Sequence, residues 1–341
     1  MNVLRTSLLS LVLAPAALVA ATAKTPAPAF DSSIIAGLGA RNIGSAAMSG
    51  RISSLDAVTM PDGKLMVWVG AASGGVWKSL DGATTFTPVF DDQPVQSIGA
   101  VEIDKRNPET VWVGTGEAWT RNSVSIGNGI YKTTDGGDTW QHLGLDGSER
   151  IGDIRIDPRA SDTVYACVTG RLWSDSLERG VYRTRDGGKT WQQVLKAPNA
   201  STGCASLSMD EKNPDVLYAA LWDFRRKGWT FRSGGESPTA TSASALMVTR
   251  DGGQTWTEVT PEKNKGFAQK PFGRIAVNVA PSDSKRIYAF VESPQSALYV
   301  SDDGGATWEA RDRSQWMVWR PFYFARMTVD PNNADRVFKD D

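Results

Sequence analysis

The chain has 341 residues, and its 37 basic and 38 acidic side chains leave a formal net charge of −1. This balance argues against a nucleic-acid binder, which needs a basic face. His142 is the single histidine, so mechanisms that need a serine–histidine relay or several histidine metal ligands are nearly excluded. The 33 glycines and 13 tryptophans, in a chain that is 40% apolar, favour a large core built from short strands and tight turns.

Residues 1–23 have the pattern of a secretory signal peptide. Arg5 supplies the positive start, an apolar run follows, and Ala21-Thr22-Ala23 places small residues before a cleavage site at Lys24. The apolar run is shorter than the roughly 20 residues that a membrane span needs. We therefore expect a secreted or periplasmic protein that has no membrane span after cleavage and begins with a Pro- and Ala-containing segment over residues 24–44.

From residue 45 onward one eight-residue pattern organises the chain. It recurs five times with a period of about 50 residues, which is in the range of propellers and solenoids. Each period also contains a short apolar strand, an Asp-Pro-type turn and a second strand, as in residues 154–166. Four strands per period make one propeller blade. We therefore predict an all-β fold, a propeller of four-stranded antiparallel blades over residues 45–341.

The repeated pattern has the form Thr-x-Asp-Gly-Gly-x-Thr-Trp, and it predicts a tight turn between the third and fourth strands. The glycines tolerate positive φ, the aspartate accepts backbone N–H groups of its own turn, and the tryptophan covers the turn. The first copy has Ala83 and Phe86 where the others have Gly and Trp, so its turn is expected to be less well made. A structural role is favoured over a five-fold calcium or catalytic set. The residues with this predicted role are Asp81, Asp135, Trp140, Asp186, Trp191, Asp251, Trp256, Asp303 and Trp308.

This pattern is the Asp-box, or BNR repeat, and the chain resembles the propeller proteins that carry it, which include sialidases, xyloglucan-active glucanases and sortilin-type propellers. Residues 74–78, 114–118, 178–183 and 220–222 are similar to bacterial sortilin-type proteins, which are often labelled glycosyl hydrolases. The resemblance covers about residues 45–341 and implies a β-propeller. Five boxes and a strand near Met327 make five blades and the start of a sixth, so we expect the natural protein to continue beyond residue 341.

Cys167 and Cys204 are the two cysteines of the chain. An oxidising compartment permits a disulfide between them. Both also lie in or near apolar runs, where buried free thiols that pack as small hydrophobic groups explain them equally well. The sequence leaves both possibilities open and disfavours a thiol nucleophile, because no histidine is near either cysteine.

The loops opposite the boxes differ from blade to blade, and loops on a rigid scaffold are where sites usually lie. They are rich in Trp and Arg, which suit sugars or peptides. The competing explanation is that these tryptophans fill spaces between blades and these arginines pair with carboxylates. The predicted ligand-binding residues are Glu117, Arg121, Arg150, Arg179, Trp222, Arg225, Trp229, Arg274, Trp319 and Arg320.

The sequence therefore favours a binding module that recognises a peptide, a protein or a polysaccharide, as the resemblance to sortilin-type propellers implies. The alternative is a glycoside hydrolase that resembles the xyloglucan-active enzymes and uses two of the carboxylates Glu117, Asp153 and Glu178. Inversion needs such a pair roughly 6.5–9.5 Å apart, and separate ion pairs for Glu117 and Asp153 would weaken this case. A sialidase is disfavoured, because Arg51-Ile52-Ser53 lacks the proline of the family's Arg-Ile-Pro motif. No cofactor or metal site is predicted.

Overall fold

The computed structural model describes residues 51–235, 237–320, 322–323 and 325–339. The predicted signal peptide and the segment 24–44 lie outside these residues. The described residues confirm the all-β prediction, with a single turn of 3-10 helix at Asp146–Ser148 and one short helix, α2 (Gln315–Val318), beside the strands. Within this part of the chain, helices that are long and apolar enough for a membrane crossing are absent.

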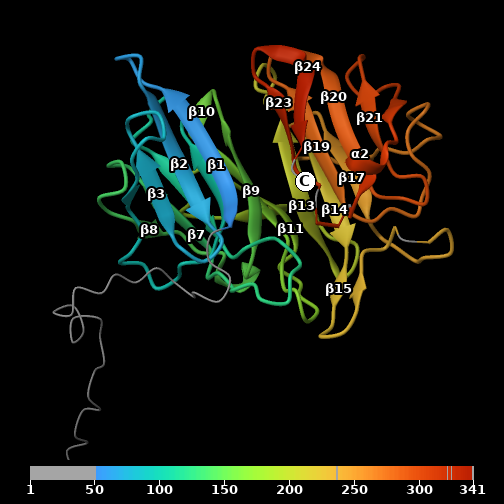
Figure 1. Cartoon of the computed structure of the whole chain (residues 1–341), viewed down its shortest axis with the longest axis horizontal. Helices are drawn as coiled ribbons and strands as arrows, with labels where there is room; N and C mark the ends of the chain where they lie inside the picture. The colour runs from blue at the N-terminus through green and yellow to red at the C-terminus, as the bar shows by residue number, and fades with distance from the viewer. Residues whose placement is uncertain (1–50, 236, 321, 324, 340–341) are drawn as a thin grey trace, which may run out of the picture. The chain divides into compact units, whose positions relative to one another are not determined.

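Five antiparallel sheets contain four strands each, as the repeat predicts (Figure 1). The first is formed by β1 (Ile52–Thr59), β2 (Leu65–Ala71), β3 (Val76–Ser79) and β4 (Thr87–Pro88). The second is formed by β5 (Ile98–Ile103), β6 (Val111–Thr115), β7 (Ile130–Thr133) and β8 (Gln141–His142). The third is formed by β9 (Ile151–Asp157), β10 (Ala160–Val168), β11 (Gly180–Thr184) and β12 (Gln192–Lys196).

The fourth sheet carries an insertion, and a shorter sheet ends the described chain. The fourth sheet is formed by β13 (Thr202–Met209), β14 (Leu217–Asp223), β17 (Ala245–Thr249) and β18 (Thr257–Glu258). The interval between the third and fourth box aspartates, Asp186 and Asp251, is longer than the others at 251 − 186 = 65 positions. It contains a hairpin of β15 (Arg225–Arg226) and β16 (Phe231–Arg232). The fifth sheet is formed by β19 (Ile275–Ala280), β20 (Asp283–Val291), β21 (Ala297–Ser301) and β22 (Glu309–Asp312). A two-stranded sheet of β23 (Met327–Asp330) and β24 (Asn333–Lys339) follows.

The Asp-boxes form the predicted turns between third and fourth strands. In the second sheet the Thr133 and Thr139 hydroxyls donate to Asp135 over 2.7 and 2.5 Å, and the Thr139 N–H donates over 2.9 Å. The hydrogen bonds of Thr139 and Thr133 lower the pKa of Asp135 to about 2. The first box makes the same bonds to Asp81, with Ala83 at a φ of 68° in the place of a glycine. Its turn is therefore fully formed, at the cost of a side chain in the left-handed region.

The box tryptophans do more than cover their own turns, because they seal the contact with the preceding sheet. The Trp140 ring lies 6.2 Å from the Trp68 ring and 4.9 Å from the Phe90 ring, both edge-on. Its Nε1–H donates to the Val89 carbonyl over 2.6 Å. Trp191 repeats this arrangement on the next sheet. These two boxes thereby join neighbouring sheets, whereas the Trp308 Nε1–H donates to the Gly305 carbonyl of its own box over 3.1 Å.

The first strands of successive sheets lie side by side in the order β1, β5, β9, β13, β19 and β23 (Figure 1). Side chains on one first strand accept backbone N–H groups from the next. Asp56 accepts from Ile103 over 2.7 Å, and Ser208 accepts from Val279 over 2.9 Å. Because these links use side chains in place of a backbone ladder, the sheets stay separate, which is a propeller-type arrangement.

The structure decides the question that the sequence left open about the cysteines. Cys167 on β10 and Cys204 on β13 form a disulfide, and both side chains are fully buried. The bond therefore joins the third sheet to the fourth.

Candidate functional site

The predicted site residues occupy the loops that follow second strands and precede first strands. Glu117 follows β6, Arg150 precedes β9, and Arg274 precedes β19. Since neighbouring strands are antiparallel, the end of a second strand and the start of a first strand share one edge of the sheet. We call this edge, which lies opposite the Asp-boxes, the loop face. The loop face thus gathers residues that are far apart in the sequence.

A cavity of about 580 Å³ opens between the first strands. Its charged lining pairs across sheets: Arg155 lies 3.2 Å from the Glu102 carboxylate, and Lys105 lies 2.7 Å from Glu211. Burial raises the pKa of Glu102 to about 8, against the attraction of Arg155. Four acidic and four basic side chains line this cavity. Its charged lining residues are Asp56, Glu102, Lys105, Asp153, Arg155, Glu211, Arg274 and Arg326.

The three candidate catalytic carboxylates have different partners. Glu117 is fully buried and forms an ion pair with Arg51. Asp153 accepts the Leu207 N–H over 3.0 Å and lies 3.9 Å from Arg155. These are separate interactions, so Glu117 and Asp153 are weakened as a catalytic pair. Glu178 is exposed and accepts only the Ser176 hydroxyl, over 3.1 Å, among the described residues.

Two of the predicted arginines support loops from inside the protein. Arg179 is buried, lies 5.0 Å from the Phe224 ring centre and donates to the Thr169 carbonyl over 2.8 Å. Arg150 is buried against Glu149, 3.0 Å away. Their guanidinium groups hold backbone carbonyls and a neighbouring carboxylate, which leaves them little contact with a ligand.

Three other predicted arginines lie nearer the surface, whereas Arg274 is buried. Arg225 pairs with Asp175 beside the β15–β16 hairpin. Arg121 is exposed, and Arg320 is exposed with its guanidinium 5.5 Å from the Trp319 ring centre. These arginines are placed where a ligand could reach them.

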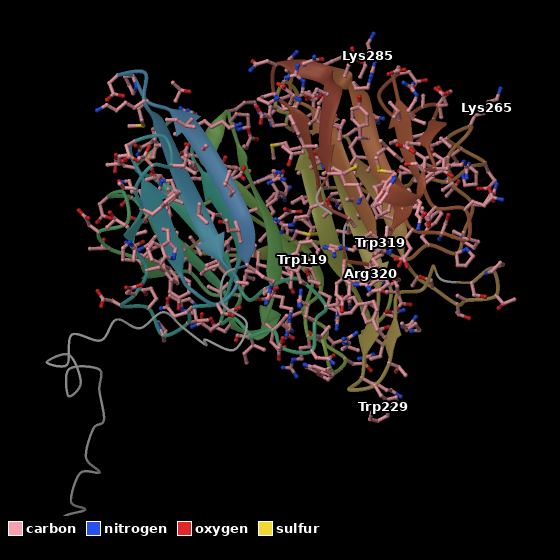
Figure 2. The ribbon with its side chains drawn as sticks, in the orientation of Figure 1. Trp119, Trp229, Lys265, Lys285, Trp319 and Arg320 are labelled. Carbon is pink, nitrogen blue, oxygen red and sulfur yellow. A yellow bond between two sulfur atoms is a disulfide. The ribbon has the colours of Figure 1, made fainter. Side chains whose placement is uncertain are left out.

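Trp222 is a buried support, and other tryptophans form the surface of the loop face. Its indole packs 4.7 Å from the Phe224 ring and donates to the Ser233 carbonyl over 3.0 Å. Trp229, at the tip of the β15–β16 hairpin, is 83% exposed (Figure 2). The strongly exposed tryptophans of the described chain all lie in loops of this face: Trp173, Trp229, Trp316 and Trp319. Trp173 and Trp316 were not among the predicted ligand-binding residues, although their position in these loops was a usable signal.

One further residue was missed by the sequence reasoning. Arg326 lines the cavity, donates to the Gly152 carbonyl over 3.2 Å and lies 5.6 Å from the Trp119 ring centre. It immediately precedes β23, just as Arg274 immediately precedes β19. The phase of the repeat could therefore have found it.

Comparison with known proteins supports the family resemblance. The family model described as sortilin, neurotensin receptor 3 (Sortilin-Vps10) matches residues 128–265. The BNR/Asp-box repeat model matches residues 299–310. The resemblance to Asp-box and sortilin-type propellers is thus confirmed.

Similar curated proteins are carbohydrate-active enzymes. A probable oligoxyloglucan-reducing end-specific xyloglucanase from Neosartorya fischeri is 27% identical over 270 residues, which cover 68% of this chain and 30% of that protein. A sialidase from Bacteroides fragilis is 25% identical over 160 residues, 40% of this chain and 29% of that protein. The chain therefore spans about 30% of the length of the xyloglucanase.

Among solved structures, the GH74 xyloglucanase from Xanthomonas campestris is similar with a TM-score of 0.59 and 16% sequence identity. The match covers 84% of this chain and 43% of that protein. At this identity the likeness supports the fold, a propeller-type arrangement of four-stranded sheets, and nothing about the reaction.

Proposed function

We propose that this chain is part of a carbohydrate-active protein and that its loop face binds a β-linked polysaccharide of the xyloglucan type. The observation that carries the proposal is the set of exposed indoles on this face, in a protein whose other tryptophans are covered. Flat indoles with polar surroundings suit the apolar faces of sugar rings. The xyloglucanase similarity supports a glucan as the first ligand to test.

Binding to xyloglucan oligosaccharides, measured by calorimetry, tests this proposal. We expect Trp173→Ala and Trp229→Ala each to weaken binding about threefold to tenfold, because each removes one stacking surface. Phe86→Ala is the control, since Phe86 is also an exposed aromatic residue but lies in the first Asp-box, on the edge opposite the loop face. Unchanged binding in both tryptophan variants would contradict a role for these indoles in binding the glucan.

We propose further that the protein is a glycoside hydrolase and that Glu178 supplies one of its carboxylates. Glu178 is exposed on the loop face and is free of ion pairs within the described residues. Reducing-sugar release from xyloglucan by the protein is expected to fall about 100-fold or more in Glu178→Gln, as for loss of an acid–base group. Glu309→Gln, an exposed carboxylate on β22, is the control. Retained binding without any release in the parent protein would favour the binding module over the enzyme.

A peptide or protein ligand is the second candidate, and the match to the sortilin family model favours it. The arginines of the loop face would then pair with acidic side chains. Binding of an acidic peptide that xyloglucan oligosaccharides do not displace would support this candidate and contradict the glucan proposal.

We also propose that the five four-stranded sheets are five propeller blades and that β23 and β24 begin a sixth. The sequential contacts of the first strands support this count. We propose in addition that the protein is exported and cleaved before Lys24. The Cys167–Cys204 disulfide supports an oxidising compartment. An N-terminal sequence of the mature protein that begins elsewhere would contradict the cleavage site.

A further inference from the structure

Four arginines occupy the same position of the repeat, immediately before the first strand of a sheet. They are Arg51, Arg150, Arg274 and Arg326. Arg51 is paired with Glu117, and Arg150 is paired with Glu149. The other two differ, because within the described residues neither Arg274 nor Arg326 forms an ion pair with a carboxylate. Equivalent positions of the repeat therefore hold two arginines that are paired with carboxylates and two that are not.

The two unneutralised groups lie against the same indole. The Arg274 guanidinium carbon is 4.6 Å and that of Arg326 is 5.6 Å from the Trp119 ring centre. Trp222 flanks Arg274 at 5.1 Å. Both arginines line the cavity. Contact with indole faces offsets part of the cost of holding two like charges together, but it supplies no hydrogen-bond acceptors.

The donors of these groups are only partly used. Arg274 Nη1 donates to the Phe322 carbonyl over 2.9 Å and reaches the Tyr323 carbonyl at 3.5 Å, and Arg326 Nη2 donates to a single carbonyl. Each guanidinium carries five N–H donors. Among the described residues, the Nε and Nη2 of Arg274 and the Nε and Nη1 of Arg326 have no acceptor.

The carboxylates nearest to this pair are occupied elsewhere. Glu292 accepts the Arg274 backbone N–H over 2.7 Å and the Ser233 hydroxyl. Asp153 accepts the backbone N–H of Leu207. Burial and the neighbouring Arg326 charge together lower the pKa of Arg274. An arriving anion would remove this repulsion and fill the unused donors.

We propose that Arg274 and Arg326 form a binding site for the carboxylate of an acidic sugar, so that the polysaccharide taken by the loop face carries uronic acid residues. The planar, forked guanidinium is suited to a carboxylate, and the exposed indoles of the loop face hold the neighbouring sugar rings. The site rests on the proposed function and narrows it from neutral glucans to acidic ones.

Calorimetry with a β-linked tri-glucuronate and with its methyl ester tests the site, because the two probes share every sugar ring and differ in the carboxylate charge. We expect the ester to bind at least about tenfold more weakly. Arg326→Gln, at a half-buried position, should remove this preference, and Arg274→Lys, which keeps the charge, should reduce it. Arg336→Gln, an exposed arginine paired with Asp330 on β23, is the control. Thermal melting establishes that each variant is folded.

The outcomes separate this inference from the proposed function. Equal binding of the acid and the ester, or a preference that survives in a folded Arg326→Gln variant, would overturn the site. If the site is overturned in this way but xyloglucan oligosaccharides still bind the protein, the proposed function stands without the acidic-sugar site. Absence of binding to every sugar, acidic or neutral, contradicts the proposed function itself. Displacement of the β-linked tri-glucuronate by tri-glutamate at equal concentration would show a site for acidic peptides and would also overturn the sugar assignment.

Discussion

Removing the disulfide between the third and fourth sheets should destabilise the protein strongly. The cysteines are 37 positions apart, on β10 and β13, and both are fully buried. Closing a loop of that length in the unfolded chain reduces its entropy by an amount worth roughly 4 kcal/mol at 25 °C. The double variant Cys167→Ala/Cys204→Ala should therefore lose about 4 kcal/mol of unfolding free energy, together with a smaller loss from packing.

Urea denaturation followed by tryptophan fluorescence measures this loss. Wild-type protein reduced with dithiothreitol is the matched control, because it keeps both sulfur atoms and lacks only the bond. The reduced protein and the double variant should shift to a lower urea midpoint by similar amounts, since the cross-link contributes most of the effect. A loss below about 1 kcal/mol in both samples would refute the loop-closure reasoning. Alkylation of both cysteines in the folded, unreduced protein would refute the disulfide itself.

Three further predictions concern the Asp-boxes. Ala83→Gly should stabilise the protein by about 0.5–1 kcal/mol: the left-handed φ of 68° costs alanine about 1–2 kcal/mol, and the greater conformational entropy of glycine in the unfolded chain cancels part of this gain. Gly82→Ala in the same turn, at a φ of 73° with open space around it, should destabilise the protein. A reversed order of the two melting temperatures would contradict the reasoning. Trp140→Ala should cost about 3 kcal/mol in urea denaturation, since its indole packs on the preceding sheet, and a cost near zero would show that the contact is dispensable. Acid should weaken the fold as the pH falls from about 4 toward 2. Hydrogen bonds lower the pKa of Asp135 from 3.8 to about 2 in the folded state, so the stability that its carboxylate gives is full above this range and is lost within it. Asp135→Asn should reduce the fall of the melting temperature with acid, and an unchanged fall would show that the box is not its cause.

The local parts of this structure were predictable from sequence because their interactions close within a few residues. The Asp135 carboxylate accepts from Thr133 and Thr139, so an eight-residue window contains the side-chain partners of the aspartate that forms the turn. The recurrence of that window predicted the four-stranded sheets for the same reason. Even the missed Arg326 could have been found in this way, since its position before β23 follows the phase of the repeat.

What the sequence alone determined is therefore the repeating unit: the box turn, the four strands and the all-β class. Tertiary structure alone decided which side chains remain available on the loop face. Glu117 and Arg274 belong to the same class of loop residue in the sequence. Arg51, which is 66 positions away from Glu117, neutralises that carboxylate. The Arg274 guanidinium contacts two indoles and forms no ion pair within the described part of the chain. Charge pairing between blades depends on the distance in space between residues that are far apart in the chain, and the period of a repeat does not specify it.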